Sequence, residues 1–310
     1  MQLSFLLFQK ILAMAIMMMM GFTLVKTKLL KSDDSKVVST VNLYLVCPCM
    51  ILMAFQLELN AERLKGLAVA FGAAIFLHLF FIVITKFIGD RLHLDVVERA
   101  SLIYSNGGNL IIPLVGSILG SEYVFYSCAF LAVQTFLHWV HLIRMYQKGT
   151  PFQIKKVIFN PNVLAIFVGM VCFFAQFTFP TLVSDVLRPV GDMVGPTAMI
   201  MMGMLMADVD LKAVFTNKRY YALMFGRLIV YPMLMILVIY ASQITRLMPG
   251  IKEVLLVTML ATSASVAVTV TQMANISGAD ARKASALNVM SIIFCIFTMP
   301  IMSAVYMWMC

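Results

Sequence analysis

The residues in this sequence best suited to chemistry are neutral, polar and placed inside apolar stretches. Segment 105–113 reads Ser-Asn-Gly-Gly-Asn-Leu-Ile-Ile-Pro. Two glycines and two asparagines weaken a helix, and Pro113 removes a backbone donor and clashes with the preceding turn. A helix that restarts near Pro113 would present unpaired N–H groups and a positive dipole end, which favour a carboxylate. The segment therefore predicts a broken helix that binds an anion.

A second polar segment, 261–265, reads Ala-Thr-Ser-Ala-Ser and lies at a matching place in the second half of the chain. Pro48 and Pro113 are 65 residues apart, and Pro196 and Thr262 are 66 apart. Paired interruptions at equivalent positions in two halves are a sequence indication of a transporter binding site. For either segment alone, a simple kink whose polar residues bond neighbouring helices remains the alternative.

The elements that position these segments are expected to be membrane-spanning helices. Hydrophobic residues make up 62% of the 310 residues and charged residues 12%, with a mean hydropathy of +0.96. Soluble domains are about half apolar and a quarter charged. Several uncharged runs reach the roughly 18 residues needed to span a bilayer, and they lack the alternation of a barrel. The sequence predicts an all-α integral membrane protein with one domain, 1–310.

Ten transmembrane helices are expected. Their approximate ranges are 3–24, 37–56, 66–87, 98–118, 123–143, 161–179, 186–206, 219–241, 253–273 and 284–308. They divide into two five-helix repeats, 1–145 and 156–310. Because five is an odd number of crossings, the second repeat would be inverted relative to the first.

The net charge of +9 follows from the connections between these helices. Sixteen of the 23 Lys and Arg residues lie in connections on one side and five on the other. Positive charges mark the cytoplasmic side, so both termini are expected outside a cell (inner) membrane. The basic excess is thus a topology signal and argues against a nucleic-acid partner.

Ionisable residues inside the spans are costly and are functional candidates by default. Arg227 could balance an anionic substrate or have a structural role. Asp192 could carry a coupling proton. His138 lies three residues before His141 on one helix face, which suits a proton relay or interfacial packing. These groups, like the six cysteines, lack the ligand spacing of a metal site, and no cofactor is expected.

Four patches of sequence resemble the auxin efflux carrier family, the PIN-like permeases that include bacterial malonate- and malate-type carriers. Segment 105–113 is similar to the family's fourth-helix motif. Asn160-Pro161-Asn162 resembles the start of its sixth helix, and Gly195-Pro196-Thr197-Ala198-Met199 its seventh. The stretch 258–300 resembles its closing segment. Each patch is weak alone, but the four occur in order across nearly the whole chain.

The resemblance implies a scaffold of helices 1, 2, 6 and 7 and a mobile unit of helices 3–5 and 8–10. Broken helices 4 and 9 would cross, and the chain would carry a small organic anion, such as malonate or malate, by elevator-like alternating access. A proton or sodium ion would couple transport, and the protein would be a homodimer in the lipid bilayer. The expected substrate-binding residues are Asn106, Gly107, Gly108, Asn109, Pro113, Gln134, Thr262, Ser263 and Ser265.

One departure from the family pattern concerns the ninth helix. The family usually has a proline at this crossing, whereas this chain has Ala261-Thr262. Small and hydroxyl residues still allow a helix to be interrupted, so a less complete interruption than in the family is expected here.

Other functions make different demands on the sequence. A bile-acid/sodium-symporter-like carrier should place acidic or carbonyl ligands near the crossing, but Glu98 and Glu122 only flank the fourth helix. A membrane enzyme would need a nucleophile–base set or metal ligands at one depth, and no such cluster is evident. A non-transporting membrane sensor remains open, although such proteins usually carry a soluble output domain.

Overall fold

The fold is entirely helical in the computed structural model, which describes residues 2–147, 149, 154–247 and 250–310. Six of the described helical stretches are long and apolar enough to cross a membrane. They are Phe5–Lys26, Ser32–Ala54, Ala61–Arg91, Ser121–Tyr146, Lys218–Ser242 and Ala281–Met309. Two shorter apolar helices, Gly107–Ile118 and Pro161–Phe174, accompany them. The expectation of a multi-pass helical membrane protein is confirmed.

The first part of the chain contains these helices in order. They are α1 (Gln2–Lys26), α2 (Ser35–Val41), α3 (Cys47–Ala54), α4 (Ala61–Arg91), α5 (Val96–Ile103), α6 (Ile112–Ile118), α7 (Ser121–Leu137) and α8 (Ile143–Tyr146). Short π-helical turns η2 (Asn42–Val46), η3 (Gly107–Ile111) and η4 (His138–Leu142) join some of them, and the 3₁₀ turn η1 (Ser32–Asp34) precedes α2.

The remainder of the chain continues in the same way. Its helices are α9 (Ile154–Ile158), α10 (Pro161–Phe174), α11 (Thr181–Asp192), α12 (Val194–Met206), α13 (Leu211–Thr216), α14 (Lys218–Phe225), α15 (Tyr231–Ser242), α16 (Ile244–Leu247), α17 (Ile251–Ser263), α18 (Val268–Ser277) and α19 (Ala281–Met309). The π-helical turn η5 (Gly226–Val230) joins α14 to α15.

Most sequence-based boundaries lie within a few residues of these, with three larger differences. Helix α11 starts at Thr181, five residues before the expected 186. Helix α4 starts five residues earlier than expected, because the Asn60 side chain accepts from the Arg63 amide and caps it. Helix α10 ends at Phe174, five residues before the expected 179. Gln176 has a φ of 51°, a left-handed conformation that ends the helix.

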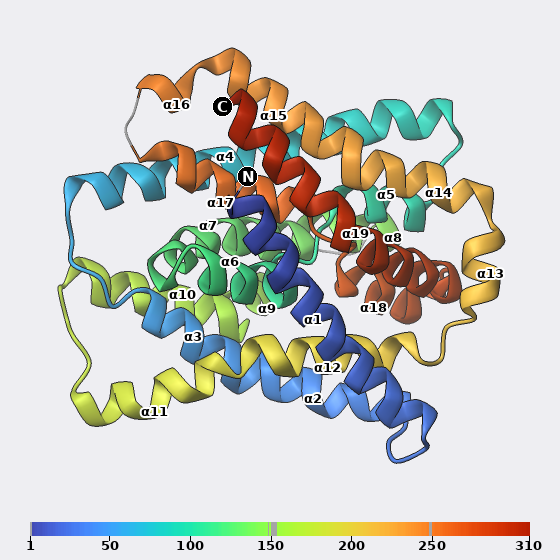
Figure 1. The fold of residues 1–310 in the computed structure, drawn as a ribbon, viewed down its shortest axis with the longest axis horizontal. Coiled ribbons are helices and arrows are strands. Elements are labelled where there is room, and N and C mark those ends of the chain that lie inside the picture. The colour runs from blue at the N-terminus through green and yellow to red at the C-terminus, as the bar shows by residue number, and fades with distance from the viewer. Residues whose placement is uncertain (1, 148, 150–153, 248–249) are drawn as a thin grey trace.

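The helices form two packed groups. Figure 1 shows α2, α3, α11 and α12 along one edge and α4, α14 and α15 along the opposite edge. Contacts follow this division, since α3 packs on α10 and α11 whereas α4 packs on α7 and α17. Helix α1 crosses the front of the view and contacts both α12 and α19.

Two glycines bring α1 and α12 into backbone contact. A Cβ atom on Gly21 would lie 2.0 Å from the Ile200 carbonyl oxygen, and one on Gly203 would lie 1.8 Å from the Met18 carbonyl oxygen. Small residues that allow such close approach are typical of helix packing in membranes. The two helices therefore form a tight pair.

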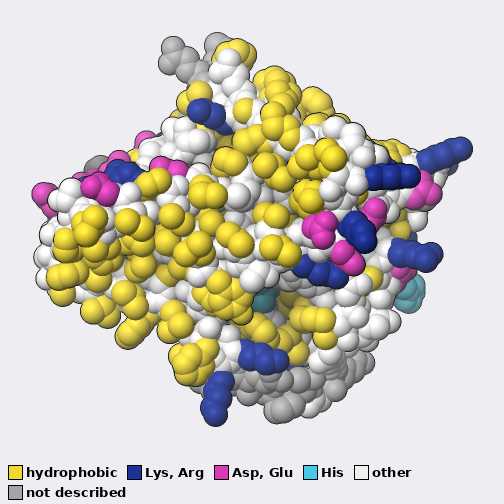
Figure 2. All heavy atoms as spheres, turned by 90° about the horizontal axis from the view of Figure 1, so that it is seen from below, with side chains coloured by type: hydrophobic (Ala, Val, Ile, Leu, Met, Phe, Trp, Pro, Cys, Tyr) yellow, Lys and Arg dark blue, Asp and Glu magenta, His cyan; other side chains and the backbone are white. Residues whose placement is uncertain are grey.

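The outer surface of the first group is apolar. Figure 2 shows a broad hydrophobic field on this face with charged side chains gathered toward its ends. Exposed members include Val37 and Tyr44 of the second span and Val186 and Met193 nearby. A soluble protein rarely exposes so large a patch, whereas a lipid-facing surface requires one.

An ionic cluster joins three helices at one end of the second group. Glu98 is buried and accepts two hydrogen bonds from Arg219, 2.5 and 2.8 Å long. Lys283 pairs with Asp95, which caps α5. Burial acts to raise the pKa of Asp95, but hydrogen bonds from Lys283 and from the Glu98 amide hold it below its ordinary value. The cluster ties α5 to α14 and α19.

Candidate functional site

Two helical interruptions lie against each other in the interior. Helix α5 ends at Ile103 and helical geometry resumes at Gly107, while α17 ends at Ser263 and α18 begins at Val268. The extended segments pair in antiparallel fashion at Ser105 and Val266. The Asn106 amide donates to the Ser265 carbonyl at 2.8 Å, and the Ala267 amide donates to the Tyr104 carbonyl at 3.1 Å. We call this pairing the crossing.

Both breaks differ slightly from the expected positions. The first occupies residues 104–106, so helical geometry resumes at Gly107, well before Pro113. Pro113 lies inside this helical stretch, as the second residue of α6. The second occupies residues 264–267. Ala264 and Ala267 there have ψ values of 161° and 135°, which are extended conformations. A full break therefore forms without the family's usual proline.

Side chains from three other helices satisfy the backbone at the crossing. Arg227 of η5 donates to the Thr262 carbonyl at 2.7 Å and to the Ala264 carbonyl at 3.1 Å. Gln134 of α7 donates to the Ser105 carbonyl at 2.8 Å. Because unpaired backbone groups are costly in a membrane interior, these bonds stabilise the breaks.

Helix α19 supplies two further partners that sequence reasoning missed. The Asn288 amide donates to the Val266 carbonyl at 2.7 Å, and the Ser291 hydroxyl accepts from the Val266 amide at 2.8 Å. The sequence did contain an indication of this role. Asn288 and Ser291 are polar residues three apart in an apolar helix, and such residues tend to bond neighbouring helices. The crossing therefore involves α19 as well as the two broken spans.

Arg227 is the largest fully buried side chain in the described part of the protein. Its two terminal nitrogens face the C-terminal end of α17, where the helix dipole is negative. The Nε atom has no hydrogen-bond partner among the described residues. The structure thus brings this coupling candidate to the crossing, where its charge faces backbone oxygens.

The predicted substrate-binding residues separate into groups by environment. Asn106 is buried and its amide contacts the Met202 sulfur at 3.5 Å. Asn109 is half-buried. The hydroxyls of Thr262 and Ser263 donate to the Met259 carbonyl within their own helix, whereas the buried Ser265 hydroxyl has no partner among the described residues.

The other candidates lie at different distances from the crossing. Gly107 packs tightly on Phe130, since a Cβ there would lie 3.1 Å from that ring. Gly108 is half-buried in the same turn. The His138 ring lies 3.4 Å from the Thr269 hydroxyl in the first turn of α18. Pro113 and Asp192 line a cavity apart from the crossing.

A large cavity of about 1210 Å³ reaches the crossing from one end of the protein. Its walls come from α2 and α12 of the first group and from α18 and α19 of the second. Val268, the first residue of α18, and Asn288 both line it. Acidic and basic side chains are mixed in its lining, including the Asp33–Lys36 pair.

Two helix N-termini meet the crossing without side-chain caps. Neither Asn106, which precedes η3, nor Ala267, which precedes α18, provides a side-chain cap. The first amides of such helices remain available as donors at a positive dipole end. Among the described residues, no group of three His, Cys, Asp or Glu could hold a metal ion.

Paired half-helices around a polar crossing, reached by a cavity between two helix groups, define a class: multi-pass helical membrane transporters. A family model described as "Membrane transport protein" matches residues 6–154 and 147–303. The chain therefore belongs to this family, the auxin efflux carriers, and the resemblance noted in the sequence is confirmed. Its members are transporters rather than enzymes. No curated protein matches the chain at a significant level.

Proposed function

We propose that this chain is a secondary carrier of a small organic anion, a mono- or dicarboxylate such as malonate or malate. The observation that carries the proposal is the pair of uncapped helix N-termini at Gly107 and Val268, of which Val268 lines the large cavity. Backbone amides there would bind a carboxylate, as helix N-termini do elsewhere. Asn109, half-buried beside them, would add an amide donor.

The proposed mechanism is an elevator-like motion. Spans 3–5 and 8–10 of the ten transmembrane spans expected from the sequence would move against a scaffold of spans 1, 2, 6 and 7. The division of contacts between the two helix groups supports it. The antiparallel pairing of the two breaks is what two inverted five-helix repeats would produce, because spans four and nine would run in opposite directions. Outside termini, a homodimer and a coupling proton or sodium ion are parts of the same proposal.

Reconstituted liposomes test transport directly. Labelled malonate, malate, 2-oxoglutarate and an aromatic carboxylate would be offered with imposed pH, sodium or voltage gradients. We expect saturable uptake of at least one anion that follows one gradient. Flux dependent only on sodium would favour a bile-acid-symporter-like mode, and no flux of any anion under any gradient would reject the carrier.

The Asn109→Ala variant tests the site. We expect anion binding to weaken by roughly 1–3 kcal/mol, because a charge-assisted hydrogen bond is lost. The matched control is Asn162→Ala on α10, an asparagine outside the crossing, which should bind as the wild type does. Unchanged affinity in a folded Asn109→Ala protein would remove Asn109 from the site.

The Asp192→Asn variant tests coupling. Asp192 lies on α11 in a cavity apart from the crossing, so a coupling role requires that the proton travels separately from the anion. If Asp192 carries the proton, pH-driven accumulation should be lost while exchange of anion across the membrane persists. Full pH-driven accumulation in the variant would exclude Asp192.

A further inference from the structure

A second cavity, of about 550 Å³, lies between α1, α3, α6 and the junction of α11 with α12. It contacts the Ser32–Ala54 span at Met50 and Met53, near the end opposite to the large cavity, which contacts that span at 32–40. None of the residues that pair at the crossing lines it. Its size is typical of a small-molecule site.

The charges in this cavity do not balance. Lys10, Arg188 and Asp192 all line it. Arg188 and Asp192 lie one turn apart on α11 and are both exposed, and the three formal charges sum to +1. Lys10 is half-buried in the first half of the apolar helix α1, and no hydrogen bond or ion pair joins it to another described residue. The cavity therefore carries an excess of one positive charge, and Lys10 is the less exposed of its two cations.

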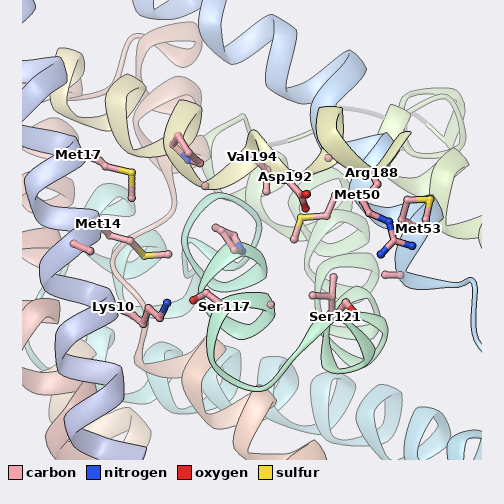
Figure 3. A pocket seen from close by; sticks show the side chains of 18 of the residues that line it. Lys10, Met14, Met17, Met50, Met53, Ser117, Ser121, Arg188, Asp192 and Val194 are labelled. Carbon is pink, nitrogen blue, oxygen red and sulfur yellow. The ribbon is translucent and has the colours of Figure 1, made fainter. Parts of the chain in front are cut away.

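The walls around Lys10 are apolar and adaptable. Met14, Met17, Met50 and Met53 contribute to them. Figure 3 shows Lys10 and Met14 reaching into the cavity from α1, with Arg188 and Met53 on the far side. Methionine side chains are flexible and polarisable and suit apolar ligands of variable shape. The lining thus places the Lys10 ammonium beside an apolar chamber.

We propose that this cavity is a second ligand site, distinct from the crossing, that binds an organic monoanion with an apolar body. The carboxylate pairs with Lys10 and the hydrocarbon part lies against the methionines. A cation at membrane depth is costly when unpaired, and a bound carboxylate offsets that cost. The site does not depend on which anion the crossing carries, because the two cavities share no lining residue.

Equilibrium binding of labelled hexanoate tests the proposal without any transport step. The protein would be held in phosphatidylcholine nanodiscs, whose lipids carry no net charge. We expect saturable binding that hexanol does not displace. Lys10→Met should lower the affinity about tenfold or more, since an ionic hydrogen bond is lost. Lys65→Met, which removes a lysine outside the cavity, is the matched control.

A variant that is expected to bind hexanoate more tightly provides a control for misfolding, because a misfolded protein would bind less. Asp192→Asn removes the negative charge from the cavity and should raise the hexanoate affinity several-fold. Asn109→Ala should leave hexanoate binding unchanged, because Asn109 belongs to the crossing. The proposal is wrong if Lys10→Met and Lys65→Met bind alike, if Asp192→Asn weakens binding, or if Asn109→Ala abolishes it.

Chemical labelling gives a second readout. Ser117 lines the cavity on α6 and appears beside Lys10 in Figure 3. A Ser117→Cys thiol should react faster with an anionic thiosulfonate reagent than with a cationic one, and hexanoate should slow the reaction. Adding Lys10→Met should remove both effects. Equal rates for the two reagents, with Lys10 intact, would overturn the proposal.

Discussion

At the scale of single residues, Arg227 explains how the second break persists without a proline. A proline interrupts a helix by withholding a donor and by steric clash. Here the interruption is stabilised from outside, because the guanidinium bonds the Thr262 and Ala264 carbonyls that the helix no longer satisfies. Arginine suits this position because its fork of donors is rigid and always charged.

Replacing Arg227 with methionine should therefore destabilise the folded protein. Two buried carbonyls lose their donors, and we expect a loss of about 2–5 kcal/mol in the free energy of unfolding. Arg227→Lys should lie between the two, since one ammonium reaches two diverging carbonyls less well. Thermal unfolding in detergent, followed by circular dichroism, measures the series. Equal stability of all three proteins would show that the carbonyls find other donors.

The candidate site was only partly predictable from the sequence. Residue type and spacing were sufficient for the breaks near Asn106 and Thr262, because glycine, asparagine and clustered hydroxyl residues weaken helices locally. Asn288 and Gln134 act through contacts between residues distant in the chain, which spacing does not encode. Gln134 was found through family resemblance, and Asn288 only through the structure.

At the scale of elements, α1 and α12 depend on contact between their backbones. At Gly21 and Gly203 the backbone of the partner helix leaves no room for a Cβ atom. The helix ranges themselves could be predicted, because apolar runs of this length have few alternatives in a membrane. The pairing of α1 with α12 could not, since glycines occur in many helices and only the packed structure distinguishes the essential ones.

Gly203→Ala should lower stability by about 1–3 kcal/mol, because the added carbon forces the two helices apart. Gly72→Ala on α4 is the control, since a Cβ there has no atom within 4 Å. Alanine favours helices more than glycine does, so this control should be neutral or more stable by up to about 1 kcal/mol. Similar losses in both variants would mean that helix propensity, rather than close packing, decides the result.

The ionic cluster at Asp95 gives a pH dependence with a defined sign. The pKa of Asp95 lies below its ordinary value in the folded protein, so the charged form favours folding. This contribution is present above the unfolded pKa of about 4 and is lost as the pH falls through the lower folded value.

Asp95→Asn tests this contribution, because asparagine caps helices about as well as aspartate and so removes mainly the charge. The difference in Tm between wild type and variant should be largest above about pH 4 and should shrink below it. Tm measured from pH 3 to pH 7 provides the check. A difference that stays constant over this range would assign the effect to capping instead.

At the scale of the whole molecule, the large cavity lies between helices of the two groups. Alternating access of the proposed kind requires one group to move against the other. Thr40 on α2 and Gln272 on α18 line opposite walls of this cavity. Their separation should change during each transport cycle.

Cross-linking these walls should stop transport. Thr40→Cys and Gln272→Cys would be introduced together after the half-buried Cys172 and Cys310 are replaced by serine. Treatment with a bismaleimide should abolish anion flux in liposomes, whereas each single cysteine variant should keep it after the same treatment. Undiminished flux in the cross-linked protein would contradict a motion between the groups.

The pairing of the two breaks consists of main-chain atoms, from Asn106 to Ser265 and from Ala267 to Tyr104. No exchange of one side chain for another removes these amides or carbonyls, with proline at a donor position as the exception. These two bonds are thus largely insulated from point mutation, while side chains that do not bond the backbone of the breaks are free to vary. Such a protein can change the substrate it selects during evolution, or in a directed-evolution experiment, without losing the main-chain hydrogen bonds that pair its two breaks.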